Sequence, residues 1–208
     1  MIPDPFAPVR QAVAPLAALP CPWFVVGGWA IDLHLGRVTR PHGDVDVAVY
    51  RRDQAAVRAF LASQGWDARK VVDGRLEPWG TDERLVLPVH EVHAALRDGG
   101  CRLELLLNEG DEVMWRFRKA LTVTRARSAV ERRTVDGLPY FAPEVPLLYK
   151  ALTSDRRPTD DADFVVALPA LAPEPRAWLA GALGGLAPGH PWHAAFAEDS
   201  TGQRRRAR

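Results

Sequence analysis

Cysteine, long apolar stretches and net charge are all scarce in this sequence of 208 residues. Its two cysteines, Cys21 and Cys101, lie in or beside apolar runs without a second Cys or a His at metal-finger spacing. They predict buried free thiols in a reducing compartment rather than a disulfide framework or a zinc finger. No run of about 18 apolar residues occurs, so no membrane span is expected. The first residues lack the basic start and apolar core of a signal peptide, which favours a cytoplasmic protein.

Positive and negative charges nearly cancel, with 27 Lys and Arg against 26 Asp and Glu and a formal net charge of +1. A chain without a global basic field is a poor candidate for bulk nucleic-acid binding. A basic cluster, Arg204 to Arg206 with Arg208, stands at the C-terminal end. We expect residues 196–208 to form a disordered basic tail.

Helical and strand-like hydrophobic patterns alternate along residues 1–142, which is typical of a compact domain that mixes helices with a sheet. Gly36 and Gly65 are the expected ends of two helices. We expect helices over 6–18, 29–35 and 53–64, and strands over 23–26, 44–49, 68–72, 84–87 and 102–107. The fold class that this pattern favours is α+β.

The pattern changes near residue 143 and becomes helical. Pro and Gly residues separate three apolar stretches, which predict helices over 143–154, 159–168 and 173–186. Residues 143–195 are therefore expected to form a helical C-terminal region.

Two aspartates, Asp44 and Asp46, alternate with valines in the expected strand 44–49. Residues two apart in a strand point to the same face, so the two carboxylates are expected to project together. Adjacent carboxylates repel each other unless a cation lies between them, and Mg²⁺ with triphosphate oxygens is the natural partner. The alternative is that both side chains belong to the solvent face of an edge strand.

A glycine pair, Gly27 and Gly28, joins the expected strand 23–26 to the helix that follows. Glycine permits close approach of the backbone to a ligand, and a helix N-terminus offers free amides to an anion. A phosphate at this turn is physically sensible, although strand-to-helix turns also use glycine for steric reasons alone. The turn lacks the Gly-Lys-Ser/Thr of a Walker A loop.

Glu104 is a lone acid in the apolar strand 102–107. If this strand lies beside the aspartate strand, Glu104 completes a carboxylate trio. It would then act as a metal ligand or as a general base toward an acceptor hydroxyl. An exposed Glu on a half-buried sheet is the alternative.

Residues 27–47, GGWAIDLHLGRVTRPHGDVDV, resemble the signature stretch of the aminoglycoside and lincosamide nucleotidyltransferases, minimal members of the DNA polymerase β-like superfamily. The resemblance includes the glycine pair, the tryptophan after it, Arg40, His42 and the Asp-x-Asp. Residues 137–150, with Asp160 and Asp163 further on, are similar to an uncharacterised branch of that group.

This resemblance implies a twisted mixed sheet flanked by helices, with residues 1–142 as the nucleotidyltransferase-like catalytic domain. It implies a Mg²⁺-dependent transfer of a nucleoside monophosphate, AMP from ATP by default, to a hydroxyl of a small-molecule acceptor. That acceptor is expected to be an aminoglycoside- or lincosamide-like compound. The alternatives are a toxin-like enzyme that modifies a protein or a tRNA end, and a catalytically degenerate nucleotide-binding protein.

The resemblance also implies roles for particular residues. Asp44 and Asp46 hold Mg²⁺, and Glu104 takes the place of the third acid. Gly27 and Gly28 face the triphosphate. Two cations, Arg40 and Lys150, are candidates for neutralising phosphate charge, each with a structural role as the alternative. Thr159 stands where relatives carry a lysine, which weakens the case for a further phosphate-binding cation there.

Some aromatic and histidine residues are weaker candidates for a site. Trp79, Trp115 and Tyr140 are candidates for lining an acceptor pocket, but packing in the core is the simpler expectation. His90 and His93 are three residues apart, whereas the zinc-protease motif needs four, so a structural or surface role is expected for both.

Overall fold

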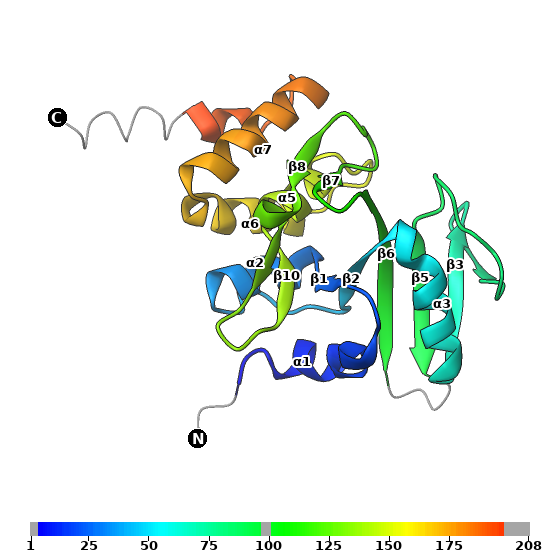
Figure 1. Cartoon of the computed structure of the whole chain (residues 1–208). Coiled ribbons are helices and arrows are strands. Elements are labelled where there is room, and N and C mark those ends of the chain that lie inside the picture. Colours follow the sequence, from blue (N-terminus) through cyan, green and yellow to red (C-terminus); the bar gives the residue numbers. More distant parts are fainter. Residues whose placement is uncertain (1–3, 97–100, 198–208) are drawn as a thin grey trace. The chain divides into compact units, whose positions relative to one another are not determined.

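The computed structural model describes residues 4–96 and 101–197 (Figure 1). The chain divides into two compact units, one up to Ala142 and one from Pro143, and each is considered by itself. Among the described residues, no helix has the length and apolar character needed to cross a membrane. Of the expected tail, residues 198–208 lie outside the described residues.

The first unit is built on one mixed sheet. Its path runs in the order β4-β3-β5-β6-β2-β1-β10-β9, and β7 pairs with β6 and β8. Neighbours β2 and β6 are parallel, as are β1 and β10, whereas the remaining pairs are antiparallel. The strands are β1 Trp23–Val25, β2 Asp46–Tyr50, β3 Trp66–Val72, β4 Arg75–Pro78, β5 Glu91–Leu96, β6 Arg102–Gly110, β7 Met114–Arg116, β8 Thr124–Ala126, β9 Glu131–Arg133 and β10 Pro139–Phe141.

Helices pack against this sheet and complete the predicted α+β fold. In the first unit α1 contacts β6, α2 contacts β2 and β10, and α3 lies along β3 (Figure 1). The helical elements of this unit are α1 Ala7–Val13, η1 Ala14–Ala18, α2 Gly27–Leu35, η2 Arg51–Asp53, α3 Gln54–Ser63 and α4 Arg127–Val130.

The core of this unit lies on one face of the central strands β2 and β6. Leu103, Leu105 and Leu107 are each at most 2% exposed and pack in one cluster with Val47 and Val49. Fully burying each of these leucines contributes about 1.5–3 kcal/mol. Because side chains alternate along a strand, the same burial turns Asp46 and Glu104 toward the opposite face.

Several predicted elements are confirmed and others are wrong. The expected helices 29–35 and 53–64 correspond to α2 and α3, but α2 already begins at Gly27. The helix expected over 6–18 ends at Val13, and a 3₁₀ turn with Pro15 in its first turn follows, because proline has no N–H for the α-helical hydrogen bond. Residues 84–87 were expected to be a strand and instead lie in a loop.

The second unit is helical, with α5 Glu144–Ala151, α6 Pro158–Ala167, η3 Leu168–Ala170 and α7 Pro173–Leu186. A buried ion pair network joins two of its helices: Lys150 Nζ of α5 lies 2.7 Å from Asp160 Oδ1 and 3.0 Å from Asp163 Oδ2 of α6. Phe164 also stacks on Trp192, with ring centroids 4.0 Å apart. The ion pairs fix α5 to α6, and the ring contact fixes α6 to the segment that follows α7.

The aromatic candidates for an acceptor pocket are core residues. Trp79, Trp115 and Tyr140 are 2%, 0% and 7% exposed, so their rings are occupied in packing. Cys21 and Cys101 are half-buried thiols, and Cys101 Sγ donates to Ala12 O at 3.3 Å. The expectation that the three aromatic side chains pack in the core is therefore confirmed.

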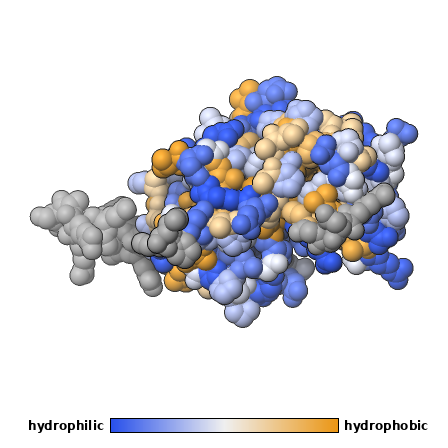
Figure 2. Space-filling view, turned by 90° about the horizontal axis from the view of Figure 1, so that it is seen from below, coloured by the Kyte–Doolittle hydropathy of each residue, from blue (hydrophilic) through white to orange (hydrophobic). Residues whose placement is uncertain are grey.

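Exposed large hydrophobic side chains come from separate segments of the described chain, among them Leu76, Val113 and Val165. On the face drawn in Figure 2, hydrophobic and hydrophilic residues are interspersed. Single exposed apolar residues are normal on a globular surface and indicate no particular partner.

Candidate active site

The first glycine of the pair lies directly against an aspartate. Gly27 begins α2 with φ +64°, a conformation that favours glycine. A Cβ atom placed on Gly27 would overlap Asp46 Oδ2 and lie 3.2 Å from Asp46 Cγ. Val26 N also donates to Asp46 O at 2.9 Å, which ties the start of β2 to the turn before α2. Close approach, as well as backbone conformation, therefore requires glycine here.

Two basic side chains pack against the second glycine of the pair, Gly28. A Cβ atom on Gly28 would overlap Arg40 Nη2 and lie 2.6 Å from His42 Cε1. Both residues belong to the loop between α2 and β2. The first turn of α2 is thus bordered by a carboxylate at Gly27 and by a guanidinium and an imidazole at Gly28.

Asp46 and Glu104 are direct neighbours across the parallel strands β2 and β6. A hydrogen bond between their side chains helps to set the pKa of Glu104, so the two carboxyl groups are in contact. His93 of β5 is the register partner of Glu104 on its other side. The three side chains form one row across the face of the sheet that lies opposite the leucine core.

Asp44 does not belong to the strand, which corrects the expectation of a strand over 44–49. β2 begins at Asp46, and Asp44 is an exposed residue two positions earlier. Its carboxylate is nevertheless close enough to Glu104 to affect the pKa of that residue. Trp29 Nε1 of α2 donates to Asp44 O at 3.1 Å and holds the backbone there. Asp46 and Glu104 are therefore neighbours, whereas a metal-binding trio with Asp44 stays a prediction, since among the described residues the carboxylates and imidazole whose ligand atoms all lie within 4.8 Å belong to Glu91, His93 and Glu104.

The environment of Glu104 disfavours its charged form. Burial raises the pKa of this carboxyl above its ordinary value, and the negative charges of Asp44 and Glu91 raise it further. His93 and the hydrogen bond with Asp46 act in the opposite direction without cancelling the effect. A cation bound among these carboxyl groups would relieve the repulsion and favour ionised Glu104.

The donor set suits a hard divalent cation. Asp44, Asp46 and Glu104 offer only carboxylate oxygens, which are the ligands that Mg²⁺ prefers. Beside them, ligand atoms of Glu91, His93 and Glu104 lie within 4.8 Å of one another. His93 Nε2 lies 2.7 Å from Glu91 Oε1, so this imidazole is already held by a carboxylate. Glu104 belongs to both groups.

The other predicted cation, Lys150, lies in the helical unit. Its ammonium contacts two carboxylates, those of Asp160 and Asp163, whose side chains are 2% exposed. Burial opposes ionisation of Asp160, but the hydrogen bonds from Lys150 and from Arg157 N outweigh it, and the pKa of Asp160 lies below its ordinary value. The described contacts therefore give Lys150 a structural function, and its role toward phosphate stays a prediction.

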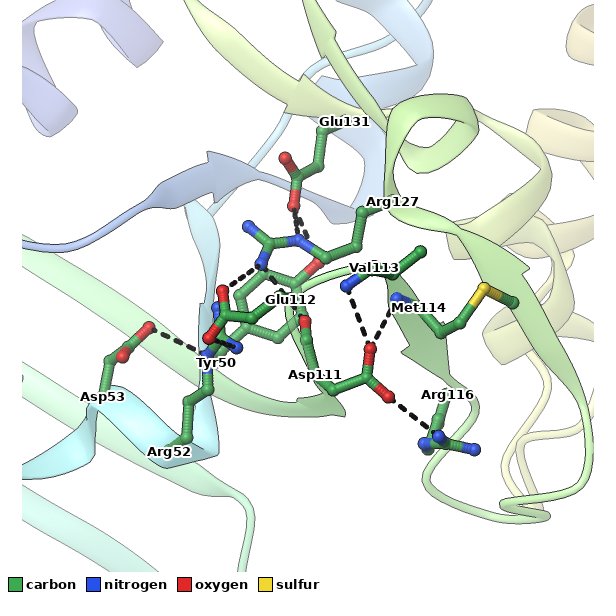
Figure 3. Close-up of polar contacts among 10 residues, drawn as sticks. All are labelled: Tyr50, Arg52, Asp53, Asp111, Glu112, Val113, Met114, Arg116, Arg127 and Glu131. Carbon is green, nitrogen blue, oxygen red and sulfur yellow. Dashed lines mark hydrogen bonds and ion pairs between the residues drawn. The ribbon is translucent and has the colours of Figure 1, made fainter.

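A polar network braces the far end of β2 (Figure 3). Tyr50 is fully buried, and its hydroxyl donates to Glu131 Oε1 at 2.8 Å. The guanidinium of Arg127 lies over the Tyr50 ring at 4.3 Å from the centroid, and Glu112 contacts both Arg52 and Arg127. This network holds the strand that begins with Asp46 to the chain around α4 and β9.

Sequence reasoning did not place four polar residues at the site. His93 and Glu91 lie on β5, a strand that was not predicted because its alternating pattern contains polar and small residues. Asp32 was expected only to cap or pair locally and His42 was given no separate role, although both lie inside the signature stretch. For Asp32 and His42, the signal in the sequence is the short spacing between α2 and the loop that follows, which allows this loop to fold back on the helix.

A comparison with known protein families decides the assignment. The model of the family described as aminoglycoside-2''-adenylyltransferase matches residues 8–142, more than half of the chain. The chain belongs to the aminoglycoside-2''-adenylyltransferase family. The expected family is confirmed.

Individual relatives agree with this family. A 2''-aminoglycoside nucleotidyltransferase of Klebsiella pneumoniae is 32% identical over 65 residues, which are 31% of this chain and 37% of that protein. The match thus spans little more than a third of the curated relative. ANT(2'')-Ia in complex with adenylyl-2''-tobramycin has a TM-score of 0.56 at 18% identity, over 86% of this chain and 97% of its own. Lincomycin-bound LnuA, a lincosamide antibiotic adenylyltransferase, has a TM-score of 0.50 at 16% identity, over 76% and 92%.

Proposed function

We propose that this adenylyltransferase-family chain is a Mg²⁺-dependent enzyme that transfers AMP from ATP to a hydroxyl of a small molecule. The observation that carries the proposal is the contact between the Asp46 and Glu104 carboxyl groups directly beside Gly27. Carboxyl groups placed together at the start of a helix suit a metal-bound triphosphate, because the helix amides attract its phosphates. A Mg²⁺ ion held by Asp44 and Asp46 would neutralise charge that develops on the phosphate oxygens.

The residues have distinct tasks in this reaction. The acceptor oxygen forms a bond to the α-phosphorus as the bond from that phosphorus to the oxygen bridging to the β-phosphate breaks. The electron pair of the broken bond leaves with pyrophosphate. Glu104, the neighbour of Asp46 on β6, accepts the hydroxyl proton as general base. Gly28 lies in the first turn of α2 with the Arg40 guanidinium against it, so a phosphate tail there would meet amides and a guanidinium.

The order of strands supports placing the two substrates on opposite sides of Asp46. Glu104 lies on β6, on one side of Asp46, and α2 follows β1 on the other side. A triphosphate that extends from Asp46 toward α2 leaves the β5 and β6 side open for the acceptor. There Glu91 and His93 would contact the acceptor near its reacting hydroxyl.

The acceptor that we propose is an aminoglycoside- or lincosamide-like compound. The support is the family itself and the ligands named for two solved relatives, adenylyl-2''-tobramycin and lincomycin. Both solved relatives are below 25% identity, so their ligands define a class to test rather than one substrate.

A direct test combines an acceptor screen with a matched pair of variants. Purified protein is incubated with Mg²⁺, ATP and a panel of aminoglycosides and lincosamides, and pyrophosphate release and adenylylated product are measured. Glu104→Gln should lose transfer while nucleotide binding persists, because the amide cannot take the proton. Glu77→Gln, on the exposed strand β4, serves as the control and should keep wild-type turnover.

Labelled ATP distinguishes this proposal from its rivals. Incorporation into an antibiotic of the panel supports it. Incorporation into total protein or tRNA, with no small-molecule product, would contradict the proposed acceptor class. Nucleotide binding without transfer to any acceptor would contradict the enzymatic proposal.

A further inference from the structure

A buried aspartate in α2 contacts the loop that carries Arg40. Asp32 is fully buried, and both of its carboxylate oxygens have a partner. Thr39 Oγ1 donates to Oδ1 at 2.6 Å, and His42 Nε2 lies 2.6 Å from Oδ2. Because a carboxylate only accepts hydrogen bonds, His42 Nε2 carries the proton of that bond. One side chain of the helix therefore holds two points of the loop, one on each side of Arg40.

His42 is held in a second way, by the packing of its ring. The ring packs against Trp29 with centroids 4.3 Å apart and ring planes at 30°, and its side chain is only 4% exposed. Its other edge lies against Gly28, where a Cβ atom would come within 2.8 Å of Nδ1. The imidazole thus fills the space between the indole and the helix backbone. A ring packed in this way holds the neighbouring groups in place and has little contact with solvent.

Arg40 lies beside this buried ring and at the same glycine. Its Nη2 occupies the space that a Cβ atom of Gly28 would need, and its Nη1 donates to Pro41 O at 3.1 Å. From the carboxyl trio outward, the order is Asp46, Gly27, Gly28 and then Arg40. Since attack at the α-phosphorus places that phosphate beside the trio, the β- and γ-phosphates would reach Gly28 and Arg40.

From this geometry we infer that Asp32 and His42 are positioning residues for binding of the pyrophosphate part of ATP. They act through Arg40: the Asp32 carboxylate fixes His42 and Thr39, and these hold the Arg40 guanidinium over Gly28. The inference rests on the proposed function, because it concerns the same nucleotide. It adds that recognition of the leaving pyrophosphate depends on a buried pair that does not itself touch the ligand.

The test uses two probes that separate the parts of the nucleotide. Binding of inorganic pyrophosphate with Mg²⁺ and binding of AMP are measured by calorimetry for the wild type and for Arg40→Met, Asp32→Asn and His42→Gln. Arg40→Met should weaken pyrophosphate binding about tenfold to a hundredfold, the range of a charged hydrogen bond. Asp32→Asn and His42→Gln should weaken it several-fold, and AMP binding should stay unchanged in all three.

Double variants show whether the pair acts through Arg40. In an Arg40→Met background, Asp32→Asn and His42→Gln should cause no further loss of pyrophosphate binding, because the group that they position is gone. His34→Gln, a half-buried histidine in the same helix, is the control and should bind both probes like the wild type. Thermal unfolding of every variant accompanies the binding measurements.

Four results would overturn the inference. Equal losses of AMP and pyrophosphate binding would mean that the pair only maintains the fold. Losses that multiply in the double variants would mean that the pair acts independently of Arg40. Wild-type pyrophosphate affinity in folded His42→Gln, alongside intact Mg²⁺–ATP binding, would remove the inference and leave the proposed function standing. A wild-type protein that binds neither ATP nor pyrophosphate would remove both.

Discussion

Replacing Gly27 by alanine should disable the site while leaving the fold intact. The added methyl group meets two obstacles. Gly27 has φ +64°, and a Cβ atom there would overlap Asp46 Oδ2. The backbone can tolerate the first obstacle at a modest cost, but the second forces the carboxylate that we place on Mg²⁺ to move.

The two effects differ in size. A non-glycine residue in the left-handed region costs about 1–2 kcal/mol, which would lower Tm by roughly 2–8 °C in a chain of this length. To restore ordinary van der Waals contact with the methyl group, the Asp46 carboxylate has to shift by about 1 Å. A displacement of that size in a catalytic constellation can reduce turnover about 100-fold.

A second glycine offers a matched control. Gly36 ends α2 with φ +68°, and no neighbouring atom of the described structure lies within 4 Å of a Cβ atom there. Gly36→Ala should therefore show the same loss of Tm and nearly wild-type turnover. Thermal unfolding and pyrophosphate release are measured for both variants. Equal activity of Gly27→Ala and Gly36→Ala would refute the close approach of Gly27 to a catalytic aspartate.

Three further predictions concern buried polar groups. Lys150→Ala should lower the free energy of unfolding by about 3–5 kcal/mol in a urea titration, because it leaves Asp160 and Asp163 buried without their cation. The pKa of Asp160 lies below its ordinary 3.8, so its ionised form stabilises the fold above that pH and the contribution is lost as pH falls through the lowered value. The stability deficit of Asp160→Asn should accordingly be full at pH 7 and shrink below about pH 4 in unfolding curves; a constant deficit would contradict this. Tyr50→Phe removes the hydroxyl that donates to Glu131 and should cost about 1.5–3 kcal/mol by the same titration, whereas an unchanged midpoint would show that the bond contributes nothing.

Much of the fold could be predicted because local patterns in this chain are strong. The leucine alternation of β6 and the apolar face of α3 follow the periods of strand and helix directly. Residues 84–87 were misread because their apolar side chains suggest a strand. In the structure Val86 and Leu87 are 62% and 38% exposed, and Pro88 comes next and cannot donate to a ladder.

The site was predicted in part, for a physical reason. The Asp-x-Asp and the glycine pair lie close in sequence, so their chemistry is visible there. The approach of Glu104 to Asp46 depends on a parallel register between β2 and β6, which only the folded sheet provides. The same holds for His93, which becomes a neighbour of Glu104 only when β5 pairs with β6.

Asp32 and Lys150 also show what the sequence alone does not predict. Their partners are set by a loop that folds back on α2 and by the packing of α5 on α6. Each could be assigned a local role from sequence, as a helix charge or as a phosphate-binding cation. Their observed partners are tertiary contacts that no local pattern encodes.

We propose above that Asp44 and Asp46 bind the nucleotide through Mg²⁺. Calorimetry with a non-hydrolysable ATP analogue tests it most directly, with and without Mg²⁺, in the wild type and in the Asp44→Asn/Asp46→Asn double variant. Asp82→Asn, in an exposed turn, serves as the control. We predict Mg²⁺-dependent binding in the wild type and the control and its loss in the double variant. Equal binding by all three proteins, or binding that ignores Mg²⁺, would contradict the account.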